Sequence, residues 1–294
     1  MEREGIHGEQ DHFEGDSNSN EAQRPKPELL PGVPLIAADR SQMYNPLVLL
    51  TQLRRVEILI AILAIGVRLI PGPRTIDDAY ITFRYAQNLL QGEGLVYNPG
   101  EHVLGITTPA YALVLAAVAL VSGGSRAEFP LLALLINAVF DGVTCWLLPK
   151  LGERLGYRSA GIASALVWAI APWSVTFAIG GLETSLLVAL ATATFYLHLS
   201  HRPVAAAATG AFALLTRPDA LLFVGPLAIA RGVQLIRAKT RPSARELLAF
   251  GLPLAIWLVG SLAYYRSPIP HSMFAKEAAY RLPAEAGLVR LLQH

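Results

Sequence analysis

Charged side chains are scarce in this sequence of 294 residues. Asp, Glu, Lys and Arg together make up 16% of it, whereas hydrophobic residues make up 53%. An ordinary soluble domain carries roughly 25% charged residues, and the mean hydropathy here is +0.42. A soluble fold of this size would need more charge to cover its surface, so the composition predicts a multi-pass membrane protein.

Cysteine is almost absent, because Cys145 is the only one. A single cysteine excludes an internal disulfide and any zinc or iron–sulfur site built from several cysteines. The glycine-rich stretch from Gly92 to Gly100 lacks the strand–loop–helix context of a nucleotide-binding loop and is typical of turns. Basic residues flank apolar segments instead of forming one face, so no nucleic-acid partner is expected.

Acidic residues are concentrated at the start of the chain. Residues 1–30 contain eight acids and three bases, a net charge of −5, whereas residues 31–294 have a net charge of +7. The first thirty residues are polar and poor in aromatics, so they cannot offset the entropy of ordering. They also lack the apolar stretch of a cleaved signal peptide. The sequence therefore predicts a disordered acidic tail over residues 1–45 and a transmembrane module over residues 46–294.

Eight apolar segments predict an all-α bundle of membrane helices. They cover residues 56–70, 107–121, 130–148, 160–178, 182–197, 203–216, 219–230 and 247–265. Cytoplasmic loops are enriched in Lys and Arg. Three groups of bases therefore mark the cytoplasmic side: Arg40, Arg54 and Arg55; Lys150, Arg154 and Arg158; and Arg231, Arg237, Lys239, Arg241 and Arg245. We expect a multi-pass protein of the cytoplasmic (inner) membrane with a cytoplasmic N-terminus.

The order of the basic groups constrains which segments cross the membrane. The chain must be outside after segment 56–70 and inside again after segment 130–148. Segment 107–121 therefore cannot cross, and its length of about 15 residues, against the ~20 that a span needs, predicts an interfacial or re-entrant helix. Segment 160–178 then crosses outward and segment 182–197 returns.

The next two segments, 203–216 and 219–230, begin and end at cytoplasmic bases, so we expect a hairpin of two short helices. Its tip, Thr216–Asp219, would point outward or into the membrane interior. The last segment, 247–265, then crosses outward. Four groups are predicted to share the outer side: the pair Asp77 and Asp78, Glu183, the hairpin tip, and the loop with His271 and Lys276.

The adjacent acids Asp77 and Asp78 are the most distinctive feature. They open the stretch DDAYITFRYAQNLL, whose residues recur at helical spacing: Ala79, Tyr80, Phe83, Ala86, Leu89 and Leu90 on one side, and Arg84, Gln87, Asn88 and Gln91 on the other. This pattern predicts an amphipathic helix on the outer surface. An N-cap needs only one acid, so the second acid favours a functional site over capping alone.

Two further acids lie in apolar surroundings. Glu183 is the only Asp, Glu, Lys or Arg between Arg158 and Arg202, and such a carboxylate is costly unless it is paired, binds a cation or faces water. The alternative is a first-turn glutamate stabilised by the helix dipole. Asp141 lies within a segment, four residues after Asn137 on the same helical face. It is either an intramembrane functional acid or part of a structural hydrogen bond with Asn137.

The remaining candidates lie near the last two apolar segments. Arg217 and Asp219 flank a proline in an apolar run. Charged groups at such a break usually line a cavity, although these two can equally pair with each other. The last loop contains two prolines, which make it non-helical. Its His271 and Lys276 are candidates for binding a phosphate at the membrane surface, although Lys276 is equally compatible with a solvated charge.

Four sequence motifs of this chain resemble those of a known protein family. DDAYITFRYAQNLLQGEGLVYNPGEHVLGITTPAY, GLET, LTRPDALL and SPIPHSMFAK occur in that order. The sequence resembles the GT-C superfamily of polyprenyl-phosphate-sugar-dependent membrane glycosyltransferases over about residues 50–280. It is most similar to the bacterial envelope arabinofuranosyl- and mannosyltransferases, and more distantly to protein O-mannosyltransferases and lipid A aminoarabinose transferases. The resemblance implies a polytopic GT-C-like helix bundle with a surface amphipathic helix in the first outer loop.

The resemblance also implies a mechanism for envelope biogenesis. Asp77 would be the general base that deprotonates an acceptor hydroxyl, with Asp78 orienting the acceptor or the base. The hydroxyl of a glycan, lipid or protein would displace polyprenyl phosphate from the sugar with inversion. The cations near the leaving phosphate would be Lys276, His271, Arg217 and Arg84. Some relatives hold a divalent metal near an acid of the second outer loop, and Glu183 would take that position for Mg²⁺ or Mn²⁺.

Two departures from the family qualify what the resemblance implies. Family members are usually much longer, so the resemblance implies that this chain, which ends at His294, is truncated. The family usually has an asparagine after a proline where His271 stands. A non-catalytic multi-pass protein is the alternative, either an inactive remnant of the family or a transporter. A transporter would need broken helices at matching positions in two halves, and the sequence predicts only one break, at Pro218.

Overall fold

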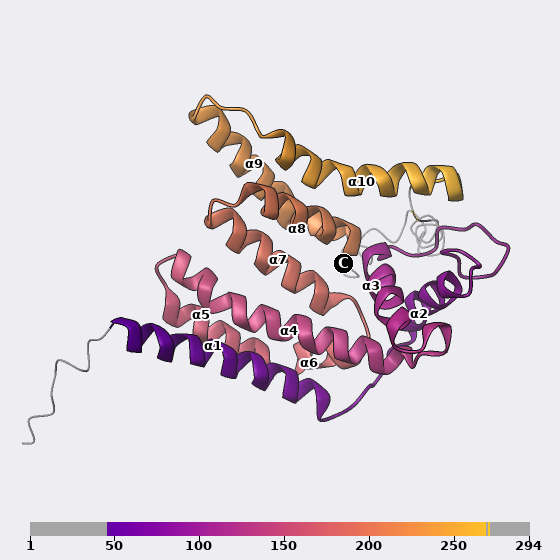
Figure 1. Ribbon diagram of the computed structural model, residues 1–294, viewed down its shortest axis with the longest axis horizontal. Helices are drawn as coiled ribbons and strands as arrows, with labels where there is room; N and C mark the ends of the chain where they lie inside the picture. The colour runs from indigo at the N-terminus through magenta and orange to yellow at the C-terminus, as the bar shows by residue number, and fades with distance from the viewer. Residues whose placement is uncertain (1–45, 269, 271–294) are drawn as a thin grey trace, which may run out of the picture. The chain divides into compact units, whose positions relative to one another are not determined.

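The structure, a computed structural model, describes residues 46–268 and 270, with side chains described from Arg55 onward (Figure 1). Within these residues the chain forms helices and no β-strand, which confirms the predicted all-α fold. The helices are α1 (Pro46–Leu69), α2 (Asp77–Leu90), α3 (Pro109–Val121), η2 (Gly124–Arg126), α4 (Phe129–Arg154), α5 (Arg158–Ile170), α6 (Pro172–Ile179), α7 (Thr184–Leu199), α8 (Pro203–Thr216), η3 (Pro218–Ala220), α9 (Leu221–Arg237) and α10 (Ala244–Tyr265). The predicted tail over residues 1–45 and the residues His271 and Lys276 lie outside the described residues.

Three helical stretches are long and apolar enough to cross a membrane: α4, η3 with α9, and α10. The pair α5 and α6 would make a fourth if it counts as one bent span. The long helix α1 carries Glu57 and Arg68, and both side chains are buried against neighbouring helices. Glu57 forms ion pairs with Lys150 and Arg158, both at 2.8 Å. The buried charge of Glu57 is therefore compensated within the protein.

Helix α4 lies at the centre of the packing, with α1, α5 and α7 beside it, while α8 packs between α7 and α10 (Figure 1). Small residues allow close approach of α4 to α5. A side chain at Gly152 would come within 2.8 Å of the Gly161 Cα. The short helix α3 packs mainly on α2, and its 13 residues make about 20 Å of helix at 1.5 Å per residue. That length is well below the ~30 Å of a hydrocarbon core, as expected for segment 107–121.

Segment 160–178 is not the continuous helix that its apolar composition predicted. It is bent by 53° between α5 and α6, because Ala171 precedes Pro172 and adopts an extended conformation (φ −62°, ψ 129°). A residue before proline is pushed out of the helical region, and proline has no N–H to donate. Carbonyl groups freed at this break are buried and need other donors.

Helix α9 also differs from its predicted bounds, since it continues past residue 230 to Arg237. The predicted segment ended at residue 230 because Arg231 was counted among the cytoplasmic bases that follow it. Instead, Arg231 stays in the helix and binds Glu246 at the start of α10, through Nε at 2.8 Å and Nη2 at 3.0 Å. The second arm of the expected hairpin is therefore a full-length helix.

Candidate active site

The acidic pair and the Gly-Gly-Leu-Glu turn are brought together at one end of the bundle. The backbone N–H groups of Arg74 and Ile76 donate to the carbonyls of Ile179 and Gly180, at 2.9 and 3.0 Å. Gly181 has φ +79°, and a Cβ there would lie 3.0 Å from Cζ of Phe83. The start of α2 is thus joined directly to the turn that leads into Glu183. This proximity agrees with the prediction that the acidic pair and Glu183 lie on the same side of the membrane.

Asp77 and Asp78 both lie in the first turn of α2 and are exposed. The N-cap position is Ile76, and no side chain caps the helix, so capping does not account for Asp77. Within the described part of the chain, neither carboxylate accepts a side-chain hydrogen bond or forms an ion pair. The positive end of the helix dipole favours negative charge at this position. The pair is therefore held in place by the helix and left open to a ligand.

The two faces of α2 differ partly from the predicted ones. Phe83 and Ala86 are buried as expected, but Tyr80 is 54% exposed and Asn88 is fully buried. The Asn88 amide is buried because it closes the loop after the helix, donating to the carbonyls of Val96 and Tyr97, both at 2.8 Å. Asp77, Tyr80 and Arg84 consequently share the exposed face of α2.

Tyr85 fixes the other side of the same loop. Its buried hydroxyl donates to the Val103 carbonyl at 2.9 Å and accepts from the Gly105 N–H at 2.8 Å. Burial raises the pKa of this hydroxyl above its ordinary value, so it stays protonated and able to donate. The carbonyl of Leu95 accepts a hydrogen bond from Tyr265 at the end of α10. The loop between α2 and α3 is therefore anchored at several points.

Glu183, Arg217 and Asp219 form one ion-pair network. Glu183 is 7% exposed and accepts from Arg217 Nη1 at 3.1 Å. Arg217 also binds Asp219 in a bidentate manner, with Nε 3.0 Å from Oδ1 and Nη2 2.9 Å from Oδ2. The pairing of Arg217 with Asp219 that the sequence left open is thus present. The hydrogen bonds that Arg217 donates to the carboxylate of Asp219 raise the pKa of the guanidinium.

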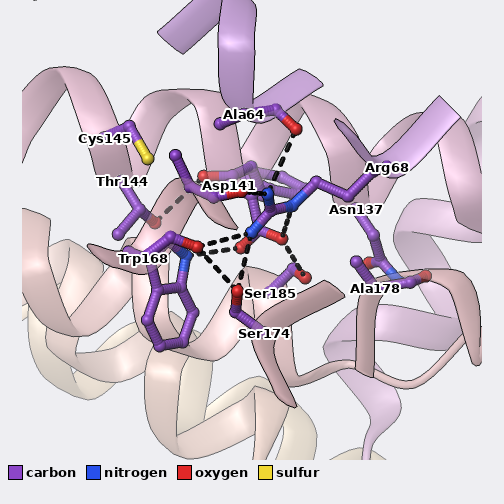
Figure 2. Close-up of polar contacts among 12 residues, drawn as sticks. Ala64, Arg68, Asn137, Asp141, Thr144, Cys145, Trp168, Ser174, Ala178 and Ser185 are labelled. Atoms are coloured by element: carbon purple, nitrogen blue, oxygen red, sulfur yellow. Dashed lines mark hydrogen bonds and ion pairs between the residues drawn. The ribbon is translucent and has the colours of Figure 1, made fainter. Parts of the chain in front are cut away.

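Asp141 is the centre of a buried structural cluster (Figure 2). Its Oδ2 accepts from Arg68 Nε at 2.7 Å and from Ser185 Oγ at 3.1 Å, and its Oδ1 accepts from Trp168 Nε1 at 3.0 Å. The hydrogen bond with Asn137 that the helical spacing suggested is not formed. Asp141 is fully engaged by protein groups, which favours a structural role over a functional one.

Arg68 also completes the break between α5 and α6. Its Nη2 donates to the carbonyl of Trp168 at 3.0 Å and to Ser174 Oγ at 3.0 Å, and its Nη1 donates to the carbonyl of Ala169 (Figure 2). Sequence reasoning missed this residue. Its only signal was a lone arginine, two residues before the end of an apolar segment, that needed a buried partner.

Asn137 makes a second support one turn from Asp141. Its amide donates to the carbonyls of Ala178 and Leu182, at 3.0 and 2.9 Å, and its oxygen accepts from Tyr111 Oη at 3.1 Å. These bonds join α3 and α4 to the turn between α6 and α7. Asn137 and Asp141 together hold the backbone on both sides of Glu183.

Two hollows flank the site. An apolar pocket of about 280 Å³ lies beside the hairpin tip, and its lining includes Pro109, Leu214, Pro218 and Trp257. An open depression of about 470 Å³ lies over the exposed face of α2. A separate apolar cavity of about 270 Å³ lies between α7, α8, α9 and α10 near Arg231, and it contains none of the candidate residues.

A metal ion at Glu183 stays a prediction. Among the described residues, no three His, Cys, Asp or Glu side chains come together as a metal site. The carboxylate of Glu183 instead contacts the guanidinium of Arg217, a cation that already compensates its charge. The donor set on the described chain therefore does not form a divalent-cation site, and no step proposed below uses one.

The chain is similar to a known enzyme. It is 32% identical over 224 residues to the terminal beta-(1->2)-arabinofuranosyltransferase of Mycobacterium tuberculosis (strain ATCC 25618 / H37Rv). The match covers 69% of this chain and 35% of that enzyme, so the chain spans about a third of the length of the relative. No family model and no solved structure matches. The similarity relates the chain to a glycosyltransferase, in agreement with the resemblance seen in its motifs.

Proposed function

We propose that this chain carries the catalytic outer end of a membrane glycosyltransferase that uses a polyprenyl-phosphate sugar. The observation that carries the proposal is the exposed, unpartnered pair Asp77–Asp78, anchored against the turn that leads to Glu183. The donor sugar proposed is arabinofuranose, because the relative acts on arabinofuranosyl groups by its name. The acceptor is an envelope glycan, lipid or protein.

Asp77 is the general base in this proposal. Its carboxylate takes the proton of an acceptor hydroxyl, the acceptor oxygen forms a bond to the anomeric carbon, and the bond from that carbon to the phosphate oxygen breaks. The electron pair leaves with polyprenyl phosphate, and the configuration inverts. A positioned carboxylate contributes about 10²–10⁴-fold by such proton transfer. Asp78, at the next position, orients the acceptor or the base.

The leaving phosphate needs positive charge nearby. Arg84 is on the exposed face of α2 with Asp77, and within the described residues it makes one hydrogen bond, to the Tyr97 carbonyl at 3.4 Å. Its charge is thus available to a phosphate. Arg217 already has two carboxylate partners, which favours a role in holding the site together. His271 and Lys276 complete the proposed set.

The lipid part of the donor would lie at the hairpin tip. The 280 Å³ pocket beside Pro218 is lined mainly by apolar side chains from α3, α8 and α10. It lies next to the Arg217 network, so a prenyl chain there would place its phosphate near the site. Burying isoprene carbons in such a pocket stabilises the complex by about 25 cal/mol per Å².

The alternative function is that of a transporter. The structure contains a second helix break, as a transporter would need, but this break does not line a pathway for a transported substrate. The break at Pro172 was not predicted, and its free carbonyls are occupied by Arg68 and Ser174. In transporters such groups bind the cargo or its coupling ion. Here they bind the protein itself, which favours a static scaffold.

The experiment that tests the proposal is sugar transfer by the purified chain in lipid nanodiscs. The probe is synthetic polyprenyl-phosphate arabinofuranose with a radiolabelled sugar, incubated with a synthetic arabinofuranoside acceptor. The proposal predicts labelled product with inverted anomeric configuration and stoichiometric polyprenyl phosphate. A product of retained configuration would overturn the proposed single displacement. Absence of donor consumption would overturn the assignment of this activity to the chain.

A further inference from the structure

Tyr97 is an exposed aromatic side chain on a firmly held backbone. Its ring is 47% exposed, yet its carbonyl accepts hydrogen bonds from Asn88 at 2.8 Å and Arg84 at 3.4 Å. The ring also rests against Tyr85, with centroids 6.2 Å apart. An aromatic ring that is pre-positioned and left uncovered is typical of recognition surfaces, because it offers contact area at little entropic cost.

Two depressions meet at this ring. The larger, about 470 Å³, is lined by Tyr80, Arg84, Gln87 and Glu128 together with Tyr97. The smaller, about 320 Å³, is lined by Asn98, Glu101 and Val103 with the same Tyr97. Tyr97 therefore borders both depressions on the surface that α2 presents to water.

The polar groups of the two depressions suit a neutral polyol. The larger holds one base, one acid and an amide, since Gln87 donates to Ser125 at 3.1 Å and keeps its oxygen free as an acceptor. The smaller holds Glu101 with Asn98, whose amide donates to it at 2.9 Å, and no base. Such mixed groups match hydroxyls, which donate and accept, whereas the smaller depression, with Glu101 and no base in its lining, would repel an acidic peptide.

We propose that these two depressions are subsites that bind the acceptor glycan, with one sugar residue in each and both next to the Tyr97 ring. The ring stacks against the C–H faces of the sugars, while the carboxylates and amides bind their hydroxyls. Tyr80, in the larger subsite, lies one helical turn after Asp77 on the same face, so a glycan held there reaches the proposed base. Arg84 lines the same subsite, where the donor phosphate and the acceptor meet. This inference rests on the proposed function.

The test is glycan binding without donor, measured by saturation-transfer NMR titration on the full chain in nanodiscs. The probes are the methyl glycosides of arabinofuranose and of its disaccharide. We expect the disaccharide to bind more tightly than the monosaccharide, because it occupies both subsites. Tyr97→Ala should weaken disaccharide binding roughly tenfold, about 1.4 kcal/mol, and remove the advantage of the disaccharide. Tyr97→Phe keeps the ring and should bind within twofold of the wild type.

Tyr157→Ala is the matched control, since that ring is 71% exposed near the other end of α4 and should leave binding unchanged. Equal disaccharide binding by Tyr97→Ala and the wild type would overturn the inference. Donor consumption is measured separately. If glycan binding depends on Tyr97 but no donor is consumed, the inference stands and the proposed function fails.

Discussion

Four of the candidate carboxylates fall into two groups according to their partners. Asp141 and Glu183 are buried, and each is bound by an arginine from a distant part of the chain, Arg68 and Arg217 respectively. Asp77 and Asp78 are exposed, and no described residue binds them. Buried charges persist when they are paired and hydrogen-bonded, whereas an unpartnered carboxylate at a helix start is available for chemistry. The partners thus separate structural acids from catalytic candidates.

The pair Arg68–Asp141 predicts a large loss of stability when one partner is removed. Arg68→Ala leaves Asp141 buried without its cation and removes the arginine donor from the carbonyl of Ala169. The carbonyl of Trp168 keeps only the hydroxyl of Ser174 as a side-chain donor. We expect a loss of about 3–5 kcal/mol, measured by thermal or denaturant unfolding in detergent. Arg237→Ala, at an exposed position near the end of α9, is the control and should change stability by less than about 0.5 kcal/mol. A loss below about 1 kcal/mol for Arg68→Ala contradicts the assigned role.

Sequence reasoning at this scale identified the acids but not their partners. Glu183 stood out as an isolated charge, and the options of pairing, cation binding or exposure were all open. Only the fold brings Arg217, 34 residues later, within 3.1 Å of it. Asp141 was matched to Asn137 because helical spacing can be read from sequence, whereas a partner on α1, 73 residues away, cannot.

At the scale of elements, short and broken helices shape the site. The break at Pro172 makes α6 a short helix whose end contacts the segment before α2, and the break at Pro218 ends α8. The Gly180–Gly181 turn then lets α2 approach closely, because a side chain at Gly180 would come within 2.7 Å of Ile76 Cδ1. Breaks and glycines thus place three chain segments together where continuous helices could not.

Gly181 tests this role of the turn. Gly181→Ala forces a Cβ into a backbone with φ +79° and to within 3.0 Å of Phe83. Strain of this kind costs about 1–3 kcal/mol, and it displaces the start of α2. We expect transfer activity to fall at least about tenfold with a lowered Tm.

Gly251→Ala is the matched control for the glycine, because nothing lies within 4 Å of its Cβ position and alanine favours a helix interior by about 1 kcal/mol. It should keep full activity and a Tm that is equal or higher. Equal transfer activity of Gly181→Ala and Gly251→Ala would contradict the proposed role of the turn in positioning α2.

The elements themselves were largely predictable. Apolar stretches between prolines and charges gave the positions of α3, α4, α7, α8 and α10, and the amphipathic pattern that starts at Asp77 gave the position of α2. The errors came from side chains that override local rules. Arg231 continues α9 because Glu246 neutralises it, Pro172 breaks a segment that reads as apolar throughout, and Asn88 is buried because the following loop needs its amide.

At the scale of the whole membrane module, the basic groups that marked the cytoplasmic side and the candidate site residues lie at opposite ends of the helices. Lys150 and Arg158 bind Glu57 at one end, where Arg231 also binds Glu246. The acidic pair, the Gly-Gly turn and the hairpin tip lie at the other (Figure 1). Cytoplasmic loops carry the excess of Lys and Arg, so we propose that the candidate site faces the outer side of the membrane.

Cysteine labelling tests this orientation. With Cys145 replaced by Ala, the exposed positions Glu93→Cys and Ser122→Cys report on the site end, and Ser159→Cys reports on the basic end. An impermeant thiol reagent added to intact cells should label the first two and leave the third unlabelled until the membrane is opened. Labelling of Ser159→Cys in intact cells would invert the topology and place the site on the cytoplasmic face.

The most direct test of the central claim is the single-turnover rate of polyprenyl phosphate release by Asp77→Asn. Asparagine keeps the size of the side chain and cannot accept the proton. The account predicts a fall of about 10²–10⁴-fold with the Kd for donor changed less than about threefold. Glu93→Gln, which removes an exposed acid shortly after α2, should keep the wild-type rate. An unchanged rate in Asp77→Asn, with donor still consumed, would contradict the assignment of Asp77 as the base.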